Sequence, residues 1–180
     1  MNPTDRFFII TGGPGSGKST LIEASIAAGL HAMPESGRAI IQEQVAAGGT
    51  ALPWADRLAF AERMFDREIH SWRAAHELEG PVMFDRGIPD VVGYLNLIGL
   101  DVPAYIEHAA RTFRYASRVF LAPHWPAIYA QDRERKQSIE EAEATCRAVT
   151  DVYVRLGYEI ISLPLVPVID RVAFVRAALI

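Results

Sequence analysis

Short apolar runs alternate along the chain with longer stretches of helical periodicity. The apolar runs predict five strands, over residues 6–11, 30–33, 82–85, 118–122 and 158–163. The stretches between them predict seven helices, over residues 18–28, 38–47, 53–78, 89–98, 103–113, 139–156 and 171–178. This alternation is typical of a parallel α/β sheet, and strands that are continuously apolar are expected where both faces of the sheet are covered.

The longest predicted helix, residues 53–78, carries apolar side chains at spacings of three and four. These side chains are Trp54, Leu58, Ala61, Phe65, Ile69 and Trp72. Their spacing predicts one apolar stripe that faces the protein interior. Trp54, Phe60 and Trp72 are also candidates to border a substrate pocket.

Composition places the chain among ordinary globular domains. It has 180 residues, of which 50% are hydrophobic and 22% are charged. A domain of this length hides roughly 70% of its unfolded surface, so we expect a single domain over residues 1–180. The net charge of -4 argues against nucleic acid as a partner. The only cysteine, Cys146, excludes an intramolecular disulfide and fits a reducing compartment.

No targeting or membrane segment is expected. The N-terminal apolar run, residues 7–10, is shorter than the roughly seven residues that a signal peptide needs in its apolar region. No segment approaches the ~18 apolar residues of a membrane span. We therefore expect a cytoplasmic protein with no membrane partner. Nothing in the sequence marks an interface, so a monomer and a homodimer both stay open.

The segment FFIITGGPGSGKST, residues 7–20, joins a hydrophobic strand, a glycine-rich turn and a helix start. It matches the phosphate-loop pattern G-x-x-x-x-G-K-[ST] in the required structural context. The backbone N–H groups of such a loop and the N-terminus of the following helix bind phosphate oxygens. Lys18 is expected to reach the β- and γ-phosphates of ATP, and the Ser19 hydroxyl to bind Mg²⁺. The predicted nucleotide-binding residues are Gly12, Gly13, Pro14, Gly15, Ser16, Gly17, Lys18, Ser19 and Thr20.

A carboxylate ends the third predicted strand. Asp85 is expected to hold Mg²⁺ directly or through water. The next residue, Arg86, stands where motor ATPases of the AAA+ type carry a second carboxylate, which argues against a motor. The base-recognition motif of GTPases and the signature motif of transporter ATPases are both absent from the sequence.

Two further segments are candidates for phosphoryl transfer. Glu35 follows the second predicted strand, at the end where α/β sheets bind ligands, and is placed to orient an attacking hydroxyl or accept its proton. An alternative role for Glu35 is a charge at a helix N-terminus. The basic segment over about residues 128–138, which includes Arg133 and Arg135, lies where small kinases carry a lid that closes over the triphosphate. A solvated, charged helix start is the other interpretation of that segment. Asp90 is likewise open between orienting substrate and a helix N-terminal charge.

Together, the segments GGPGSGKST, PESGR, VMFDRGIPDVVGYL, VFLAPHW, DRERK and LGYEIISLP resemble the AAA_28-type phosphate-loop family. That family is similar to the nicotinamide-riboside kinase domain of NadR and, more distantly, to nucleoside and nucleotide kinases. The resemblance covers nearly the whole chain. It implies a five-stranded parallel sheet of order 2-3-1-4-5, ATP with Mg²⁺ as donor, and Arg133 and Arg135 as lid arginines. It also implies that Glu35 and Asp85 lie near the acceptor or the metal, that Arg86 contacts the acceptor or a phosphate, and that residues 164–167 cover the adenine.

The resulting hypothesis is an ATP-dependent kinase of a small molecule with a hydroxyl or phosphate acceptor. In this hypothesis the catalytic residues are Lys18, Glu35, Arg86, Arg133 and Arg135. The first alternative is a nucleotide-binding regulatory module or slow ATPase without kinase activity. The second is a phosphotransferase directed at a toxin or an antibiotic. Neither the loop nor the resemblance names the acceptor.

Overall fold

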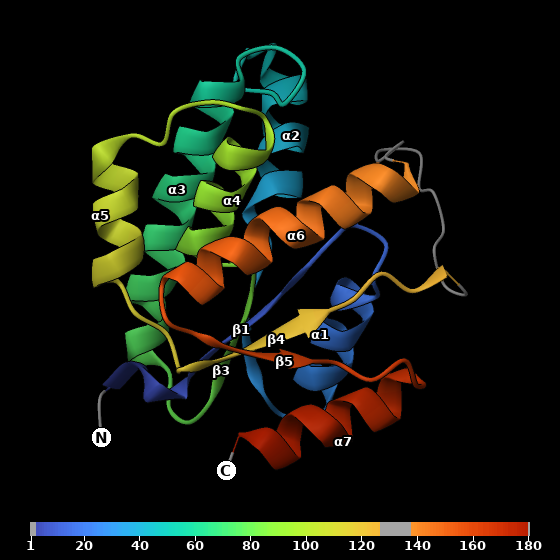
Figure 1. Cartoon of the computed structure of the whole chain (residues 1–180). Coiled ribbons are helices and arrows are strands. Elements are labelled where there is room, and N and C mark those ends of the chain that lie inside the picture. The colour runs from blue at the N-terminus through green and yellow to red at the C-terminus, as the bar shows by residue number, and fades with distance from the viewer. Residues whose placement is uncertain (1–2, 127–137, 180) are drawn as a thin grey trace.

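A five-stranded parallel sheet forms the centre of the protein (Figure 1). The structure, a computed structural model, describes residues 3–126 and 138–179. The strands are β1 (Phe7–Gly12), β2 (His31–Met33), β3 (Val82–Asp85), β4 (Arg118–Ala122) and β5 (Glu159–Ser162). Their order is β2-β3-β1-β4-β5, and each neighbouring pair is parallel. The predicted fold class and strand order are therefore confirmed.

Helices cover both faces of the sheet (Figure 1). They are α1 (Lys18–Ala27), α2 (Ser36–Ala47), α3 (Arg57–Ala74), α4 (Ile88–Leu97), α5 (Ala104–Thr112), α6 (Ile139–Arg155) and α7 (Val168–Ala178), with 3₁₀ turns η1 (Pro3–Arg6) and η2 (Ala75–Glu77). Helices α1 and α7 lie on one face, and α4, α5 and α6 lie on the other. None of the helices in the described ranges combines the length and apolarity that a membrane span requires.

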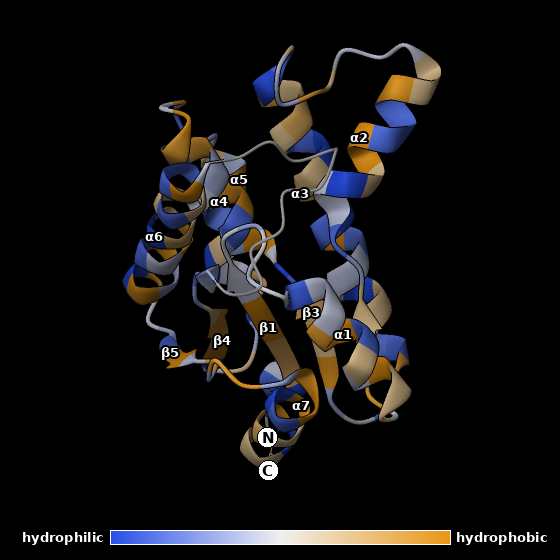
Figure 2. Cartoon of the chain, turned by 90° about the vertical axis from the view of Figure 1, so that its right-hand side faces the viewer, coloured by the Kyte–Doolittle hydropathy of each residue, from blue (hydrophilic) through white to orange (hydrophobic). Residues whose placement is uncertain are grey.

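The alternation of side chains along β1 builds two cores. Phe7 and Ile9 pack on the face that α4, α5 and α6 cover, whereas Phe8 and Ile10 pack on the face that α1 and α7 cover. All four side chains are buried, because successive residues of a strand point to opposite faces and helices cover both. Figure 2 shows the central strands in hydrophobic colours between helices of mixed character.

The prediction of strands buried on both faces is wrong for the two edges of the sheet. The strands β1 and β3 are buried throughout and β4 nearly so, but every residue of β2 and β5 is partly or fully exposed. The reason is topological. An edge strand has a neighbour on one side only, and the helices reach less far over it.

The prediction of the longest helix is also corrected. Helix α3 begins at Arg57 and not at residue 53, because Asp56 caps it: its Oδ1 accepts a hydrogen bond from Ala59 N at 3.0 Å. Trp54 therefore stands outside the apolar stripe and is 65% exposed. Helix α7 begins three residues earlier than predicted, at Val168, directly after Pro167.

Ser138 is the N-cap residue of α6. Its Oγ accepts from Glu141 N at 3.2 Å, and its own N–H donates to Glu141 Oε2 at 2.7 Å, a capping box that starts α6.

The predicted lid residues Arg133 and Arg135 lie outside the described residues.

Candidate functional site

The phosphate loop connects the end of β1 to the start of α1. Gly17 is the N-cap of α1 with a φ of 78°, a conformation that L side chains rarely adopt. Gly12 lies so close to β4 that a Cβ atom would come within 2.2 Å of the Ala122 carbonyl oxygen. Both glycines are therefore required by the shape of the loop, in addition to any ligand that it binds.

Lys18 is folded back onto this loop. Its side chain is buried, and Nζ donates to the Gly13 carbonyl at 2.6 Å and to Ser16 Oγ at 3.3 Å. Ser19 and Thr20, the next two residues of α1, are exposed to solvent. The ammonium group is thus held inside the loop, where an anion would meet it together with the helix N-terminus.

Asp85 ends β3 beside the loop, because its register partner on β1 is Ile10. Its side chain is buried, and Oδ1 has no hydrogen-bond partner in the described part of the chain. Burial raises the pKa of Asp85, the Lys18 ammonium lowers it, and the balance lies above the ordinary value. A buried carboxylate oxygen without a partner and an exposed Ser19 hydroxyl are ligands of the type that Mg²⁺ prefers, so these residues fit that cation.

Arg86, the next residue, lies between two carboxylates. Its Nε is 3.5 Å from Glu35 Oε1, and its Nη1 is 3.2 Å from Asp90 Oδ1. Burial lowers the pKa of Arg86, but Glu35, Asp90 and Asp85 raise it by more, so it stays charged. The predicted residues Glu35, Asp85 and Arg86, from the ends of two neighbouring strands, are therefore brought together at one edge of the sheet.

Asp90 holds this cluster in place. Its Oδ1 accepts from Arg86 Nη1 and from Thr11 Oγ1, and its Oδ2 accepts from Tyr153 Oη at 2.6 Å and from Gly87 N at 3.0 Å. The carboxylate is buried, and four donors compensate for the loss of water around it. The helix N-terminal alternative for Asp90 is confirmed, because Asp90 lies in the first turn of α4 and accepts from the N-cap amide of Gly87. The structure adds a second role, in which this carboxylate joins β1, α4 and α6.

The backbone of Arg86 is itself unusual. Its φ of 76° is the only positive φ of a non-glycine residue in the described part of the chain. An L-residue in the left-handed region costs about 1–2 kcal/mol. The amide of Arg86 donates to the Ile10 carbonyl at 3.0 Å, which fixes the turn that aims the side chain toward Glu35. Such strain is tolerated where the surrounding structure determines the conformation.

A pocket of about 720 Å³ opens next to this cluster. Its volume lies within the range of about 300–1,000 Å³ that small-molecule sites occupy. Residues of α2 and α3, and of α4 and α6, contribute to its lining. Pro14 of the phosphate loop, Glu35, Arg86, Trp54 and Phe60 line it. Of the three aromatic candidates, Trp54 and Phe60 therefore border the pocket.

Trp72, the third aromatic candidate, packs in the core instead. Its ring lies edge-on to Phe7 and to Phe113, with centroids 6.0 and 5.0 Å away. Its indole N–H donates to the Arg114 carbonyl at 2.9 Å. This tryptophan satisfies its one donor with backbone and has no part in the pocket lining.

Glu68 is a site residue that the sequence reasoning missed. It is 3% exposed on α3, and Oε1 accepts from Ser36 Oγ at 2.7 Å. Burial raises its pKa to about 8, and the Ser36 hydrogen bond lowers it less. The signal in the sequence is a row of lining residues at spacings of four, Phe60, Met64 and Glu68, in which an acid stands among apolar side chains.

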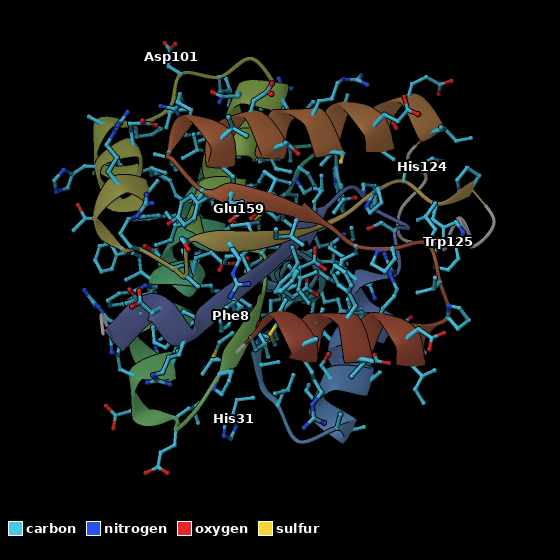
Figure 3. All side chains as sticks on the ribbon, turned by 60° about the horizontal axis from the view of Figure 1, so that its bottom comes forward. Phe8, His31, Asp101, His124, Trp125 and Glu159 are labelled. Carbon is cyan, nitrogen blue, oxygen red and sulfur yellow. The ribbon has the colours of Figure 1, made fainter. Side chains whose placement is uncertain are left out.

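Arg171 ties the phosphate loop to the segment after β5. It is 2% exposed; Nη1 donates to the Ser16 carbonyl and Nε to the Pro164 carbonyl, both at 3.1 Å. Its guanidinium carbon lies 5.3 Å from the centroid of the Trp125 ring. Figure 3 shows Trp125 and His124 beyond the carboxyl end of β4.

In the described part of the chain, no group of three or more histidine, cysteine and acidic residues has the arrangement of a metal site.

Comparison with known proteins identifies the family. No curated protein sequence matches this chain. Solved structures similar in fold include thymidylate kinase from Ehrlichia chaffeensis, with 15% identity, a TM-score of 0.63 and coverage of 98% of this chain and 99% of that one. Deoxyadenosine kinase from M. mycoides with bound dATP has 15% identity, a TM-score of 0.62 and coverage of 96% and 98%.

A third similar structure is the NadR protein in complex with NR. It has 15% identity and a TM-score of 0.65, and the match covers 89% of this chain but 46% of that one. At this identity the likeness establishes the fold. A family model is decisive for membership: AAA_28, described as an AAA domain, matches residues 7–171, so the chain belongs to the AAA_28 family.

Proposed function

We propose that the protein is an ATP-dependent kinase that transfers the γ-phosphoryl group to a small-molecule acceptor in the pocket beside Glu35 and Arg86. One observation carries this proposal: Pro14 of the phosphate loop and the Glu35–Arg86 pair line the same pocket. A donor site that only hydrolyses ATP needs no second pocket of small-molecule size at its phosphate end. The fold neighbours named deoxyadenosine kinase and thymidylate kinase support the same reaction class.

On the donor side, the loop of residues 12–20 would bind the ATP phosphates through its backbone N–H groups and the N-terminus of α1. An incoming phosphate oxygen would replace the Gly13 carbonyl as the partner of Lys18 Nζ. Ser19 and Asp85 would hold Mg²⁺, which neutralises phosphate charge when bound. The lid arginines Arg133 and Arg135 would add positive charge to the transferring group and help to exclude water.

On the acceptor side, Glu35 would accept a hydrogen bond from the attacking hydroxyl and take its proton as the new P–O bond forms. The bond between the γ-phosphorus and the bridging oxygen then breaks, and ADP leaves with that electron pair. Arg86 would hold Glu35 in position through their ion pair and would also face the transferring group. Its second ion pair, with Asp90, would fix the guanidinium for both tasks. Positioning and electrostatics supply most of the rate in phosphoryl transfer.

Two substitutions test the proposal separately. Lys18→Ala should abolish ATP binding while the fold stays intact, since it removes the cation inside the loop. Glu35→Gln should keep ATP affinity within about threefold and lower transfer to acceptor by at least about a hundredfold, the usual range for a general base. ATP binding is measured by calorimetry and transfer with γ-labelled ATP. Unchanged ATP affinity in Lys18→Ala would contradict the site; binding without any transfer in the wild type would favour a regulatory module or slow ATPase.

A further inference from the structure

The charges that line the pocket favour one class of acceptor. Among the described lining residues that are not exposed, Glu35 and Asp90 are carboxylates, Glu68 is an acid that burial keeps neutral, and the single cation is Arg86. Arg86 already contacts Glu35 and Asp90. A phosphate on the acceptor would carry nearly two negative charges into this surrounding, and a buried charge needs a partner of opposite sign.

The pocket also offers hydrogen-bonding groups that the protein does not use. Glu68 Oε1 accepts from Ser36 Oγ, but Oε2 has no hydrogen-bond partner among the described residues. The Tyr94 hydroxyl, on the opposite side in α4, is buried and likewise has no partner in the described part of the chain. Unsatisfied buried polar groups cost about 1–3 kcal/mol each. The buried Tyr94 hydroxyl and the second carboxyl oxygen of Glu68, both on one pocket, point to polar groups of a ligand.

Between these groups the walls are aromatic and apolar. Phe60 and Tyr94 meet edge to face, with centroids 5.6 Å apart, and Trp54 stands exposed at the rim. Walls of this kind with few polar groups are typical of small-molecule sites, and aromatic side chains pack favourably against another ring. The two open polar groups then fix the orientation of the ligand and select its substituents.

We propose that the acceptor is an uncharged, hydroxyl-bearing molecule with a flat ring, and that Glu68 and Tyr94 are specificity-determining residues that hydrogen-bond polar substituents of that ring. This inference rests on the proposed kinase function and deepens it. It selects a hydroxyl over a phosphate as the attacking group. It also gives Glu68 a role in binding the acceptor that differs from the role of Glu35.

The surroundings of Glu68 keep it neutral and suited to this task. Ser36 contacts it from α2, Asp85 and Arg86 lie near it at the end of β3, Asp90 lies near it on α4, and Tyr115 is a further neighbour. Burial and the two aspartates raise its pKa by more than Ser36 and Arg86 lower it. A neutral carboxyl group both donates and accepts a hydrogen bond, and is complementary to an amide-type edge.

The first experiment separates acceptor classes without knowing the acceptor. Small molecules of a cell extract are passed over an anion exchanger at neutral pH, which gives an uncharged and cationic fraction and an anionic fraction. Each is incubated with the full protein and γ-labelled ATP, with Lys18→Ala as background. We expect a labelled organic product from the first fraction only. Product from the anionic fraction only would overturn the acceptor proposal and leave the kinase standing, whereas no product from either fraction would overturn the kinase itself.

The second experiment tests Glu68 in the active fraction. Glu68→Ala should raise the amount of acceptor needed for half the maximal rate at least about tenfold, with the KM for ATP unchanged. Glu68→Gln should stay within about threefold, because an amide also donates and accepts a hydrogen bond. An exposed acid of the same helix, Glu62→Gln, is the matched control and should behave as the wild type. Equal losses in Glu68→Ala and Glu68→Gln, or no loss in either, would overturn the role of Glu68.

Tyr94→Phe tests the same pocket with a variant that should fold even if the Glu68 variants do not. It keeps the ring that packs against Phe60 and removes only the hydroxyl that has no partner. The fold should therefore remain, and the half-maximal acceptor amount should rise about three- to tenfold, as expected for one lost hydrogen bond. Wild-type behaviour of Tyr94→Phe would remove Tyr94 from the proposal.

Discussion

The Asp90 carboxylate binds the guanidinium of Arg86, four residues before it in the chain, with 3.2 Å between Oδ1 and Nη1. The same carboxylate accepts a hydrogen bond from Thr11, the residue of β1 that directly precedes Gly12 of the phosphate loop. It accepts another from Tyr153 of α6. Asp90 therefore links the strand that carries the phosphate loop to the arginine that lines the pocket.

Asp90→Asn should slow transfer more than it weakens nucleotide binding. The substitution removes the charge that orients Arg86 but leaves the loop glycines and Lys18 in place. We expect kcat to fall about 10- to 100-fold, the cost of a misplaced group near the reacting atoms, with ATP affinity within about threefold. Steady-state kinetics and calorimetry measure the two. Tyr153→Phe, which removes one hydrogen bond from Asp90 Oδ2, should give a smaller loss of kcat; an Asp90→Asn variant with wild-type kcat would refute the positioning role.

Arg86→Gly and Arg86→Ala separate the backbone of Arg86 from its side chain. Both variants lose the guanidinium, so both should lose transfer activity. The glycine variant should be more stable than the alanine variant by about 1 kcal/mol, since only glycine adopts a positive φ without strain. Urea unfolding at fixed pH measures this difference. Equal stabilities would mean that the turn rearranges when the side chain is lost.

Glu68 should make stability depend on pH. Its pKa is raised from 4.5 to about 8, so its contribution is fully present below pH 4.5 and is lost as pH rises through about 8. Relative to Glu68→Gln, the wild type should therefore lose on the order of a few kcal/mol of unfolding free energy between pH 5 and pH 9. Urea unfolding across that range gives the comparison. Parallel curves for the two proteins would show that Glu68 is charged at neutral pH.

Arg171→Met should destabilise both the fold and the nucleotide loop. It leaves the Ser16 and Pro164 carbonyls without their buried donor, which costs about 2–4 kcal/mol. ATP affinity should fall as well, because Ser16 belongs to the loop. The control lies on the same helix: Arg176→Met removes a hydrogen bond to the Ala28 carbonyl that is exposed, and should cost less than about 1 kcal/mol. Similar losses of stability in the two variants would contradict the role of Arg171 in joining the phosphate loop to the segment after β5.

The parallel sheet was predictable from local patterns, whereas the order of its strands followed from the family resemblance. Apolar runs mark the strands, and the glycine-rich turn after β1 has a shape that few sequences allow. Helix ends were less predictable. The start of α3 depends on Asp56 as an N-cap. Asp56 stands only two residues after Trp54, which continues the apolar spacing and so hides the boundary.

The site was predictable where it follows strand ends. Glu35, Asp85 and Arg86 come directly after β2 or at the end of β3, and parallel strands bring such residues to one edge. Glu68 and Arg171 were not predictable in the same way, because each lies within a helix whose rotation and packing place it. The helix N-terminal position of Asp90 was predictable, but its hydrogen bonds with Thr11 and Tyr153 were not, because those residues are distant in sequence.

The fate of the γ-phosphoryl group tests the central claim most directly. The wild type and Glu35→Gln are incubated with γ-labelled ATP and the uncharged and cationic metabolite fraction, and the label in inorganic phosphate and in organic product is measured separately. The account predicts that most label consumed by the wild type ends on an organic molecule, and that Glu35→Gln loses this product while it still binds ATP. Label that ends only on inorganic phosphate, at equal rates in both proteins, would contradict it.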